Sequence, residues 1–339
     1  MDERPSPTMA DVAQRAGVSR ALVSIVFRGA PGASADSRAR VLRAAEELGY
    51  RPDHRARLLG RGRSHTVGVV FGLRDEFHGG LVEALYAEAG QRGWDLALGA
   101  TAPSRSEAEA VHSLLEQRCE ALVLLGPALA RKELEAVADQ VPLVVAARRV
   151  ARRAAGPAYD VVRTDDVAGA RLAVDHLVAL GHRRIAHADG RDAPGAAERR
   201  RGYQQAMEAA GLASAVHALD GGPDETAGER SAEQLLRIPR RRRPTAVVAF
   251  NDHCAVGLLA ALRGAGSRVP QDLSVVGYDD SRVAALSSVD LTTVRQDASR
   301  LAQDALGLAL ERVDDPSRVG REIVVPPALV PRSTTAAVA

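Results

Sequence analysis

The sequence has few aromatic residues, few cysteines and no long apolar run. Phe, Trp and Tyr make up 3% of the 339 residues, and its two cysteines, Cys119 and Cys254, stand apart within apolar stretches. We expect both thiols to be small core side chains in a reducing compartment. The longest apolar run, near residues 121–130, contains Gly126 and Pro127 and is too short to span a bilayer. Because residues 1–9 lack the apolar segment of a secretory signal, we expect a cytoplasmic protein that does not bind membranes.

Catalytic and metal-binding signatures are also absent. The sequence contains no G-x-x-x-x-G-K-[ST], no H-E-x-x-H and no G-x-S-x-G. Neither cysteine has the spacing of a metal ligand, and the nine histidines include no i,i+4 pair beside a glutamate. We therefore expect no catalysis, no metal and no organic cofactor.

The charge of the chain is divided unevenly. A length of 339 residues predicts two or three domains, and 46% apolar residues are enough to form packed cores. Residues 1–63 hold 12 Arg against 7 Asp and Glu, a net charge of +5, whereas the rest of the chain has a net charge of −3. This asymmetry indicates a basic head for a polyanion, joined to a nearly neutral body.

The head begins with the signals of two short helices. Thr8 and Asp11 have the spacing of a capping box, and Gly17 stands where a residue with positive φ ends a helix. Ser19 can cap a second helix over Arg20–Phe27.

A third helix follows from Ser34 and ends at Gly49. Its inward-facing residues are expected to be Val41, Leu42, Ala45 and Leu48. Two helices joined by a tight glycine turn and supported by a third predict a helix-turn-helix.

From residue 66 onward, short β-rich runs alternate with amphipathic helical stretches. The predicted strands are residues 66–71, 95–100, 121–125, 142–147, 184–188, 245–250 and 273–278. The predicted helices include residues 81–91, 106–117, 169–180, 200–210 and 255–263. This alternation predicts parallel sheets covered on both faces, and the length of the body predicts two such α/β lobes.

The second helix of the head is the predicted reader of DNA bases. A helix fits the major groove and presents its N-terminal side chains first, so Arg20 and Ala21 are the main candidates. Ile25 lies one turn further on, where it can touch a thymine methyl group or pack in the core. The candidates for phosphate contacts, which are equally explained as helix caps, are Ser19, Ser24, Ser34 and Ser37.

A second group of polar residues follows the predicted strands of the body. Asp189, Asn251 with Asp252, and Asp279 each come at or directly after the end of a strand, where ligands bind in open α/β folds. Arg199 adds a fork of hydrogen-bond donors. Such groups suit a ligand rich in hydroxyls, although each residue is also explained singly, as a helix cap or a surface charge.

Several motifs together resemble the lac/gal repressor family (LacI/GalR). They are residues 8–13 (TMADVA), 16–19 (AGVS), 23–24 (VS), 49–52 (GYRP), 174–177 (VDHL), 180–186 (LGHRRIA), 251–252 (ND), 274–280 (SVVGYDD) and 331–335 (PRSTT). They cover nearly the whole chain in the order in which the family has them.

The resemblance implies three parts. These are a helix-turn-helix DNA-binding domain over residues 1–52, a hinge helix and linker over 53–63, and a two-lobed core similar to periplasmic binding proteins over 64–339. In the hinge, it implies that Leu59 is a wedge in the minor groove, with Leu58 as the alternative, and that Arg55 and Arg57 neutralise phosphates. At the effector site it implies Arg199, Asn251 and Asp279, with Phe77 as an apolar wall.

The resemblance also implies a homodimeric regulator, a repressor, that binds a pseudo-palindromic double-stranded operator under allosteric control by a small ligand. The sequence departs from the family at Ile25 and Arg28, within a five-residue stretch (25–29) that in many members is Arg-Val-Leu-Asn-Gly, so a polar side chain is lost at position 25. Arg28 is therefore a further candidate for DNA contact, and no operator sequence is carried over.

Alternatives remain for the ligand and for the function. A sugar or a related polyhydroxy metabolite is favoured as effector, although few aromatics are present to stack on its rings. A free-standing binding protein of the periplasmic type would share the core but would lack the basic head. An α/β enzyme that modifies sugars or nucleotides would show turnover by the isolated core.

Overall fold

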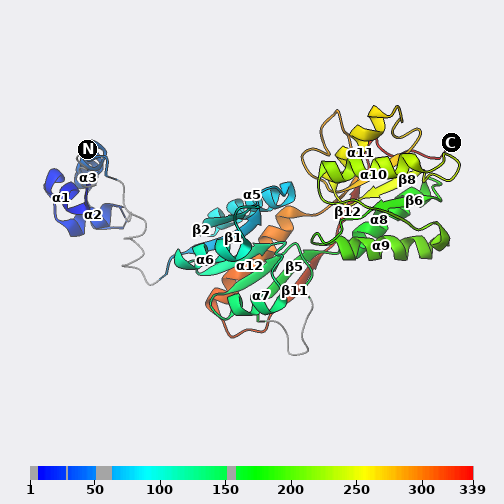
Figure 1. Ribbon diagram of the computed structural model, residues 1–339. Helices are drawn as coiled ribbons and strands as arrows, with labels where there is room; N and C mark the ends of the chain where they lie inside the picture. Colours follow the sequence, from blue (N-terminus) through cyan, green and yellow to red (C-terminus); the bar gives the residue numbers. More distant parts are fainter. Residues whose placement is uncertain (1–6, 28–29, 51–62, 151–157, 339) are drawn as a thin grey trace. The chain divides into compact units, whose positions relative to one another are not determined.

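The computed structural model describes residues 7–27, 30–50, 63–150 and 158–338 of the chain. Internal contacts divide it into two units, Met1–Ser64 and His65–Ala339. Figure 1 shows the first unit as helices only and the second as two α/β lobes. Within the described ranges, no helix has the length and apolar character needed to cross a membrane.

The first unit, which we call the head, contains α1 (Met9–Ala16), α2 (Arg20–Phe27) and α3 (Ala35–Leu48). The predicted capping box between Thr8 and Asp11 is present, and Gly17 ends α1 at φ 65°. The buried apolar side chains of all three helices form one small core, made of Val12, Ala13, Ala16, Val23, Val26, Val41, Ala44 and Ala45. The head is thus a complete three-helix unit with its own core.

The prediction that Leu42 faces this core is wrong, because the Leu42 side chain is 50% exposed. On a helix of 3.6 residues per turn, positions 41, 44, 45 and 48 share one face, and position 42 is turned away from it by about 100°. Ala44, which the sequence prediction did not name, takes the buried place.

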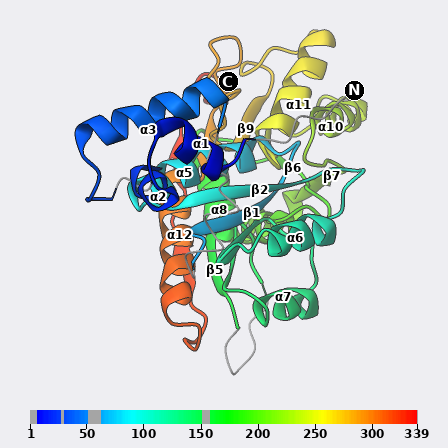
Figure 2. The same cartoon turned by 90° about the vertical axis from the view of Figure 1, so that its left-hand side faces the viewer.

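The N-lobe is a six-stranded parallel sheet with helices on both faces. Its strand order is β11 (Glu322–Val325), β5 (Asp160–Thr164), β4 (Leu143–Ala146), β3 (Ala121–Leu125), β1 (Thr66–Gly72) and β2 (Asp95–Thr101). Helices α5 (Glu76–Gln91) and α12 (Ala298–Asp314) pack on one face. Helices α6 (Glu107–Glu116) and α7 (Arg131–Ala138) pack on the other, as Figure 2 shows for α12 against α6 and α7.

The C-lobe repeats this plan with a second six-stranded sheet. Its order is β12 (Ala328–Val330), β10 (Thr293–Arg295), β9 (Ser274–Asp279), β8 (Ala246–Ala249), β6 (Ile185–Ala188) and β7 (His217–Leu219), with only β12 antiparallel. Helices α10 (Glu225–Arg237) and α11 (Asp252–Gly264) cover one face. The other is covered by α8 (Asp166–Ala179) and α9 (Ala196–Ala209), and the short helix η1 (Ala213–Ala215) precedes β7.

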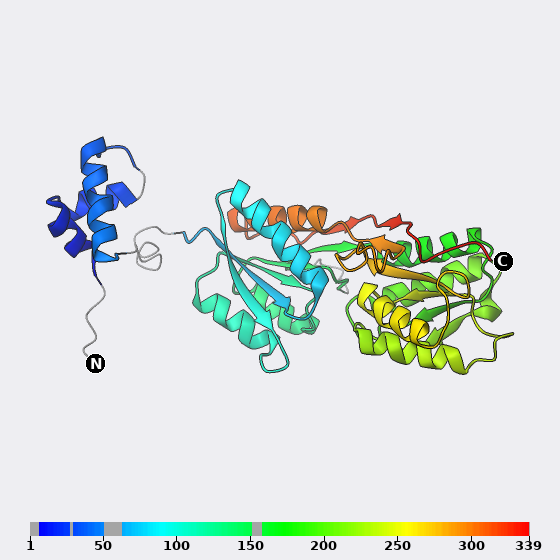
Figure 3. The same ribbon diagram turned by 90° about the horizontal axis from the view of Figure 1, so that it is seen from above.

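The chain passes between the lobes at three points: from β5 to α8, from β10 to α12, and from β11 to β12. Figure 3 shows the last of these crossings, where the C-terminal segment leaves the N-lobe for the C-lobe. The first and third crossings are joined by a 3.0 Å hydrogen bond from the Asp165 amide to the Val325 carbonyl oxygen. Three adjacent connections form a hinge about which the lobes can change their angle.

Helices α10 and α11 lie side by side at a distance that only glycine permits. A Cβ atom on Gly257 would overlap the Glu225 carbonyl oxygen, and one on Gly228 would overlap the Cys254 carbonyl oxygen. In each case the obstacle is backbone, so the helices themselves would have to separate.

We therefore expect Gly257→Ala to lower the free energy of unfolding by about 3 kcal/mol, as overpacking does in cores. Gly264→Ala, in the same helix but with open space around the added methyl group, is the matched control. Urea denaturation measures both variants. Equal stability of the two would contradict the close-packed contact.

Candidate DNA-reading head and effector cleft

The start of α2 carries the side chains that the sequence predicts to read bases. Arg20 and Ala21 are exposed, whereas Val23 and Val26 of the same helix are buried in the head. Ile25 is half-buried, which is compatible both with contact to a thymine methyl group and with packing in the core of the head. Because its buried face packs against α1 and α3, α2 presents its first turn to solvent.

Two of the four predicted phosphate-binding serines act as helix caps in the free head. The Ser19 hydroxyl accepts a 3.2 Å hydrogen bond from the Leu22 amide. The Ser34 hydroxyl accepts one of 3.2 Å from the Ser37 amide and donates one of 3.0 Å to the Ser37 hydroxyl. Capping explains these serines without DNA, and their contact with phosphate, like that of half-buried Ser24, stays a prediction.

The remaining predicted DNA contacts, Arg28, Arg55, Arg57 and Leu59, lie outside the described residues. Their roles, and the division of the chain at residues 52 and 63, also stay predictions.

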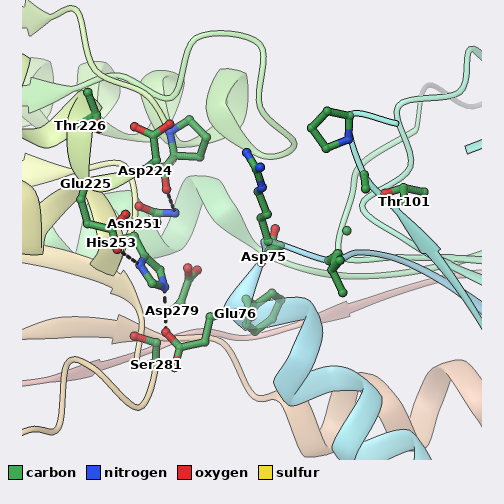
Figure 4. A pocket seen from close by; sticks show the side chains of 17 residues that line it. Asp75, Glu76, Thr101, Asp224, Glu225, Thr226, Asn251, His253, Asp279 and Ser281 are labelled. Atoms are coloured by element: carbon green, nitrogen blue, oxygen red, sulfur yellow. Dashed lines mark hydrogen bonds and ion pairs between the residues drawn. The ribbon is translucent and has the colours of Figure 1, made fainter. Parts of the chain in front are cut away.

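A cleft of about 540 Å³ lies between the two lobes of the core. Leu73, Phe77 and Thr101 line it from the N-lobe, and Asn251, Asp279 and Ser281 line it from the C-lobe (Figure 4). A volume in this range accommodates a small metabolite. Three of the four predicted effector residues, Phe77, Asn251 and Asp279, thus lie in one cavity.

Two of the predicted polar strand ends, Asn251 and Asp279, meet at this cleft because their strands are neighbours. Strands β6, β8 and β9 lie side by side in parallel, so their carboxyl ends share one edge of the sheet. Asn251 follows β8 and also caps α11, accepting a 2.8 Å hydrogen bond from the Cys254 amide. Asp189, after β6, pairs with Arg200 and does not line the cleft.

Arg199 lies beneath the cleft and is not one of the residues that line it. Its side chain is only 6% exposed, and its Nε atom donates a 2.8 Å hydrogen bond to Asp166 Oδ1. Its Nη1 atom donates one of 2.8 Å to the Phe250 carbonyl oxygen, and Nη2 lies 3.7 Å from Asp279 Oδ1. The guanidinium carbon also lies 3.7 Å from the centre of the Tyr278 ring, a cation–π arrangement.

The electrostatics of this buried network hold Arg199 charged. Burial lowers the pKa of Arg199, but the charges of Asp166 and Asp279 outweigh it and raise the pKa. Burial raises the pKa of Asp279 well above its usual range, against the lowering effect of Arg199. The carboxyl group of Asp279 therefore lies under two opposing influences: burial favours its neutral form, and the Arg199 cation behind it favours its charged form.

Asp279 also has a strained backbone. Its φ is 114°, in the region that favours glycine. Its carboxylate is held by a 2.7 Å hydrogen bond from Gln296 Nε2, which lies in the second crossing between the lobes. Strain of this kind persists where the surroundings fix the residue, and it is common at functional sites, so it agrees with the prediction for Asp279 on grounds independent of sequence.

A histidine joins the two lobes at the cleft. His253 Nε2 lies 2.8 Å from Glu76 of the N-lobe, and its Nδ1 lies 2.5 Å from Glu225 of the C-lobe. Figure 4 shows this Glu76–His253–Glu225 bridge beside Asp279. Burial lowers the pKa of His253, but the hydrogen bonds and charges of Glu225 and Glu76 outweigh burial and raise it.

The bridge predicts a pH dependence of stability. A raised pKa in the folded protein means that the stabilisation is full below the unfolded pKa of about 6.5 and is lost as pH rises through the folded pKa. We expect His253→Gln to lower the midpoint of thermal unfolding more at pH 6 than at pH 9. An equal loss at both pH values would contradict a charged bridge.

Sequence reasoning missed the acidic residues that line the cleft, Asp75, Glu76, Asp224 and Glu225, together with His253. The available signal was helix capping, since Asp75 and Asp224 are the N-caps of α5 and α10. Capping residues are common, and only the fold shows that these two helices begin at one cavity. No group of three or more His, Cys, Asp or Glu side chains among the described residues is placed to hold a metal ion.

Two family profiles match the chain. That of the bacterial regulatory proteins of the lacI family matches residues 8–53, and that of the periplasmic binding protein-like domain matches residues 174–335. They confirm the predicted helix-turn-helix head and the predicted two-lobed α/β core.

Relatives match nearly the full length. The chain is 37% identical over 308 residues to the HTH-type transcriptional regulator GalS of Salmonella typhimurium, covering 90% of this chain and 89% of GalS. It is 31% identical to the lac repressor dimer solved with operator and the anti-inducer ONPF, covering 98% of this chain and 100% of that one at a TM-score of 0.81. It is 30% identical to a CelR–cellobiose complex, covering 97% and 99% at a TM-score of 0.69. The chain therefore belongs to the lacI family of bacterial transcriptional regulators.

Proposed function

We propose that this regulator is a homodimeric repressor whose affinity for a pseudo-palindromic operator is controlled by a sugar or related polyhydroxy ligand bound between its lobes. The observation that carries the proposal is the cleft itself, where Asn251, Asp279 and Phe77 meet above the buried Arg199. Carboxylate and amide groups bind hydroxyls, and Phe77 offers a ring face. A relative that matches 97% of this chain was solved with cellobiose, which supports a carbohydrate.

A ligand bound in the cleft can change the angle between the two lobes through contacts at the three crossings that form the hinge. Asp279 lies in the cleft and accepts a hydrogen bond from Gln296, while Arg199 connects Asp279 to Asp166 at the start of α8. Gln296 and Asp166 adjoin two of the three crossings between the lobes. A ligand that bonds to Asp279 would therefore alter contacts at the hinge, and by linkage operator and ligand would change each other's affinity by the same factor.

On the DNA side, we propose that Arg20 and Ala21 contact base edges from the major groove. A bidentate contact from Arg20 to guanine would contribute about 1–3 kcal/mol of discrimination. The dimer, as in the lac repressor solved on its operator, would place two heads on two half-sites. The proposed action is binding without catalysis, in the cytoplasm where the DNA is.

The test is selection of genomic fragments by the purified full-length protein, followed by sequencing. We expect the retained fragments to share one pseudo-palindromic motif, and we expect release by a candidate sugar to depend on its concentration. Retention of fragments without a common motif would contradict sequence-specific repression, and turnover of the sugar would support an enzyme instead.

A further inference from the structure

The cleft between the lobes is lined mainly by negative charge. Five acidic side chains line it: Asp75, Glu76, Asp224, Glu225 and Asp279, of which Glu76 and Glu225 are paired with His253. Among the described lining residues, only Arg74 and His253 can carry positive charge. The nearby buried cation, Arg199, is already engaged with Asp166, Asp279 and a carbonyl oxygen.

The backbone donors of the three helices that begin at the cleft are partly occupied from within the protein. Asp75 Oδ1 accepts a 3.2 Å hydrogen bond from the His78 amide at the start of α5. Asp224 Oδ1 accepts one of 2.8 Å from the Ala227 amide at the start of α10. Asn251 Oδ1 occupies the Cys254 amide of α11 in the same way. Helix N-termini bind anionic ligands through such amides, and in each of these three helices a side-chain oxygen already occupies one of them.

The capping aspartates line the cavity and have acceptor oxygens beyond those that bind the helix amides. Each capping aspartate has a second carboxylate oxygen, of which that of Asp75 lies 3.6 Å from His78 Nε2, and Asp279 has a second oxygen beyond its bond with Gln296. The charges also act across the cavity, since the influences that raise the pKa of Asp279 are burial first, then the charge of Asp252, and then that of Asp75 from the N-lobe. A ligand with hydroxyl or ammonium donors would satisfy these oxygens, whereas a phosphate or carboxylate would be repelled.

We propose that the effector is a polyhydroxylated ligand that is neutral or carries an ammonium group, and that the cleft excludes sugar phosphates and uronates by charge. This inference rests on the proposed function, that a carbohydrate binds in this cleft. The inference predicts an order of affinity among derivatives of one parent sugar. The amino sugar binds more tightly than the neutral sugar, and the neutral sugar binds more tightly than its uronate or phosphate.

The experiment measures binding by the full-length dimer, using calorimetry after a thermal-shift screen. The probes are matched sets that differ in one group: glucose, glucosamine, glucuronate and glucose 6-phosphate, and the corresponding galactose set. A wider screen of pentoses and disaccharides uses amino and acidic forms of each. We expect the binding sugars to follow the proposed order, with neighbouring classes separated by about tenfold in Kd, as one charge contact in a partly exposed site provides.

Two variants test the cause of the ranking. Asp75→Asn and Asp224→Asn keep an oxygen for the helix cap and remove one negative charge each. We expect each to reduce the preference for the amino sugar over the neutral sugar by about tenfold. Asp139→Asn, an exposed position at the end of α7 away from the cleft, is the matched control and should keep the ratio of the parent protein.

The outcomes separate this inference from the proposed function. A uronate or phosphate that binds at least as tightly as its neutral parent would overturn the inference while leaving a carbohydrate regulator. If both aspartate variants kept the full preference for the amino sugar over the neutral sugar, the negative charge of Asp75 and Asp224 would not be its cause. If no sugar of any class binds while operator binding is intact, the carbohydrate part of the proposed function fails, and this inference fails with it.

Discussion

Replacing Arg199 with alanine is expected to abolish the sugar response and to lower the free energy of unfolding of the core by about 3–5 kcal/mol, the usual cost of breaking a buried ion pair from one side. The substitution removes the cation that balances Asp166 and Asp279 and leaves the Phe250 carbonyl oxygen without this donor. It also disconnects the cleft from the start of α8. Operator binding without sugar should persist at temperatures at which the variant is folded.

Arg171→Ala is the matched control for this experiment. Arg171 lies on α8 and pairs with Asp175, but its side chain is 66% exposed, so its loss should change stability by about 0.5 kcal/mol or less. Urea denaturation and sugar-induced release from operator are measured for both variants. A normal sugar response in Arg199→Ala would remove Arg199 from the effector mechanism, and a stability equal to that of Arg171→Ala would contradict the buried pair.

Leu59→Ala is expected to weaken operator binding far more than binding to random duplex. If a leucine from each subunit enters the minor groove, its loss removes the stabilisation that a bent operator provides, while the phosphate contacts remain. The expected cost is about 2–3 kcal/mol, or roughly 30- to 150-fold in Kd. Fluorescence anisotropy on both duplexes at one salt concentration provides the measurement, because phosphate contacts depend steeply on salt.

Leu58→Ala serves as the control. It also decides which of the two leucines in the predicted hinge helix, within residues 53–63, enters the minor groove. A larger specific loss for Leu58→Ala would assign the wedge to Leu58. Equal losses on operator and random duplex, for both variants, would refute a wedge role for this segment.

Local signals in the sequence are sufficient to predict the head. Thr8, Asp11 and Gly17 act through contacts within a few residues, so their spacing alone defines α1. The same holds for the ends of β8 and β9, where Asn251 and Asp279 follow apolar runs. The prediction for Leu42 is wrong because only three of the four apolar positions named for α3 share one face of the helix.

Contacts between distant residues are not predictable in this way. Strand β5 is not predictable from its local sequence, because it begins with Asp160, a charged residue typical of loops. In the fold, Asp160 is fully buried and bonded at 2.9 Å to Arg312, which lies 152 residues further along the chain. The bridge of His253 to Glu76 likewise joins residues 177 positions apart. Such pairs form only because the order of strands and helices in the fold brings them together. The periodicity of apolar residues along the sequence does not define that order.

The most direct test of the regulator is a comparison of two duplexes in one assay. The purified full-length protein is titrated onto its selected operator and onto a scrambled duplex of equal length at moderate salt, with and without the sugar that binds the cleft. We predict operator binding at least about 10³-fold tighter than binding to the scrambled duplex, and a change in operator affinity on adding sugar. Equal affinity for both duplexes, with and without sugar, would contradict the account.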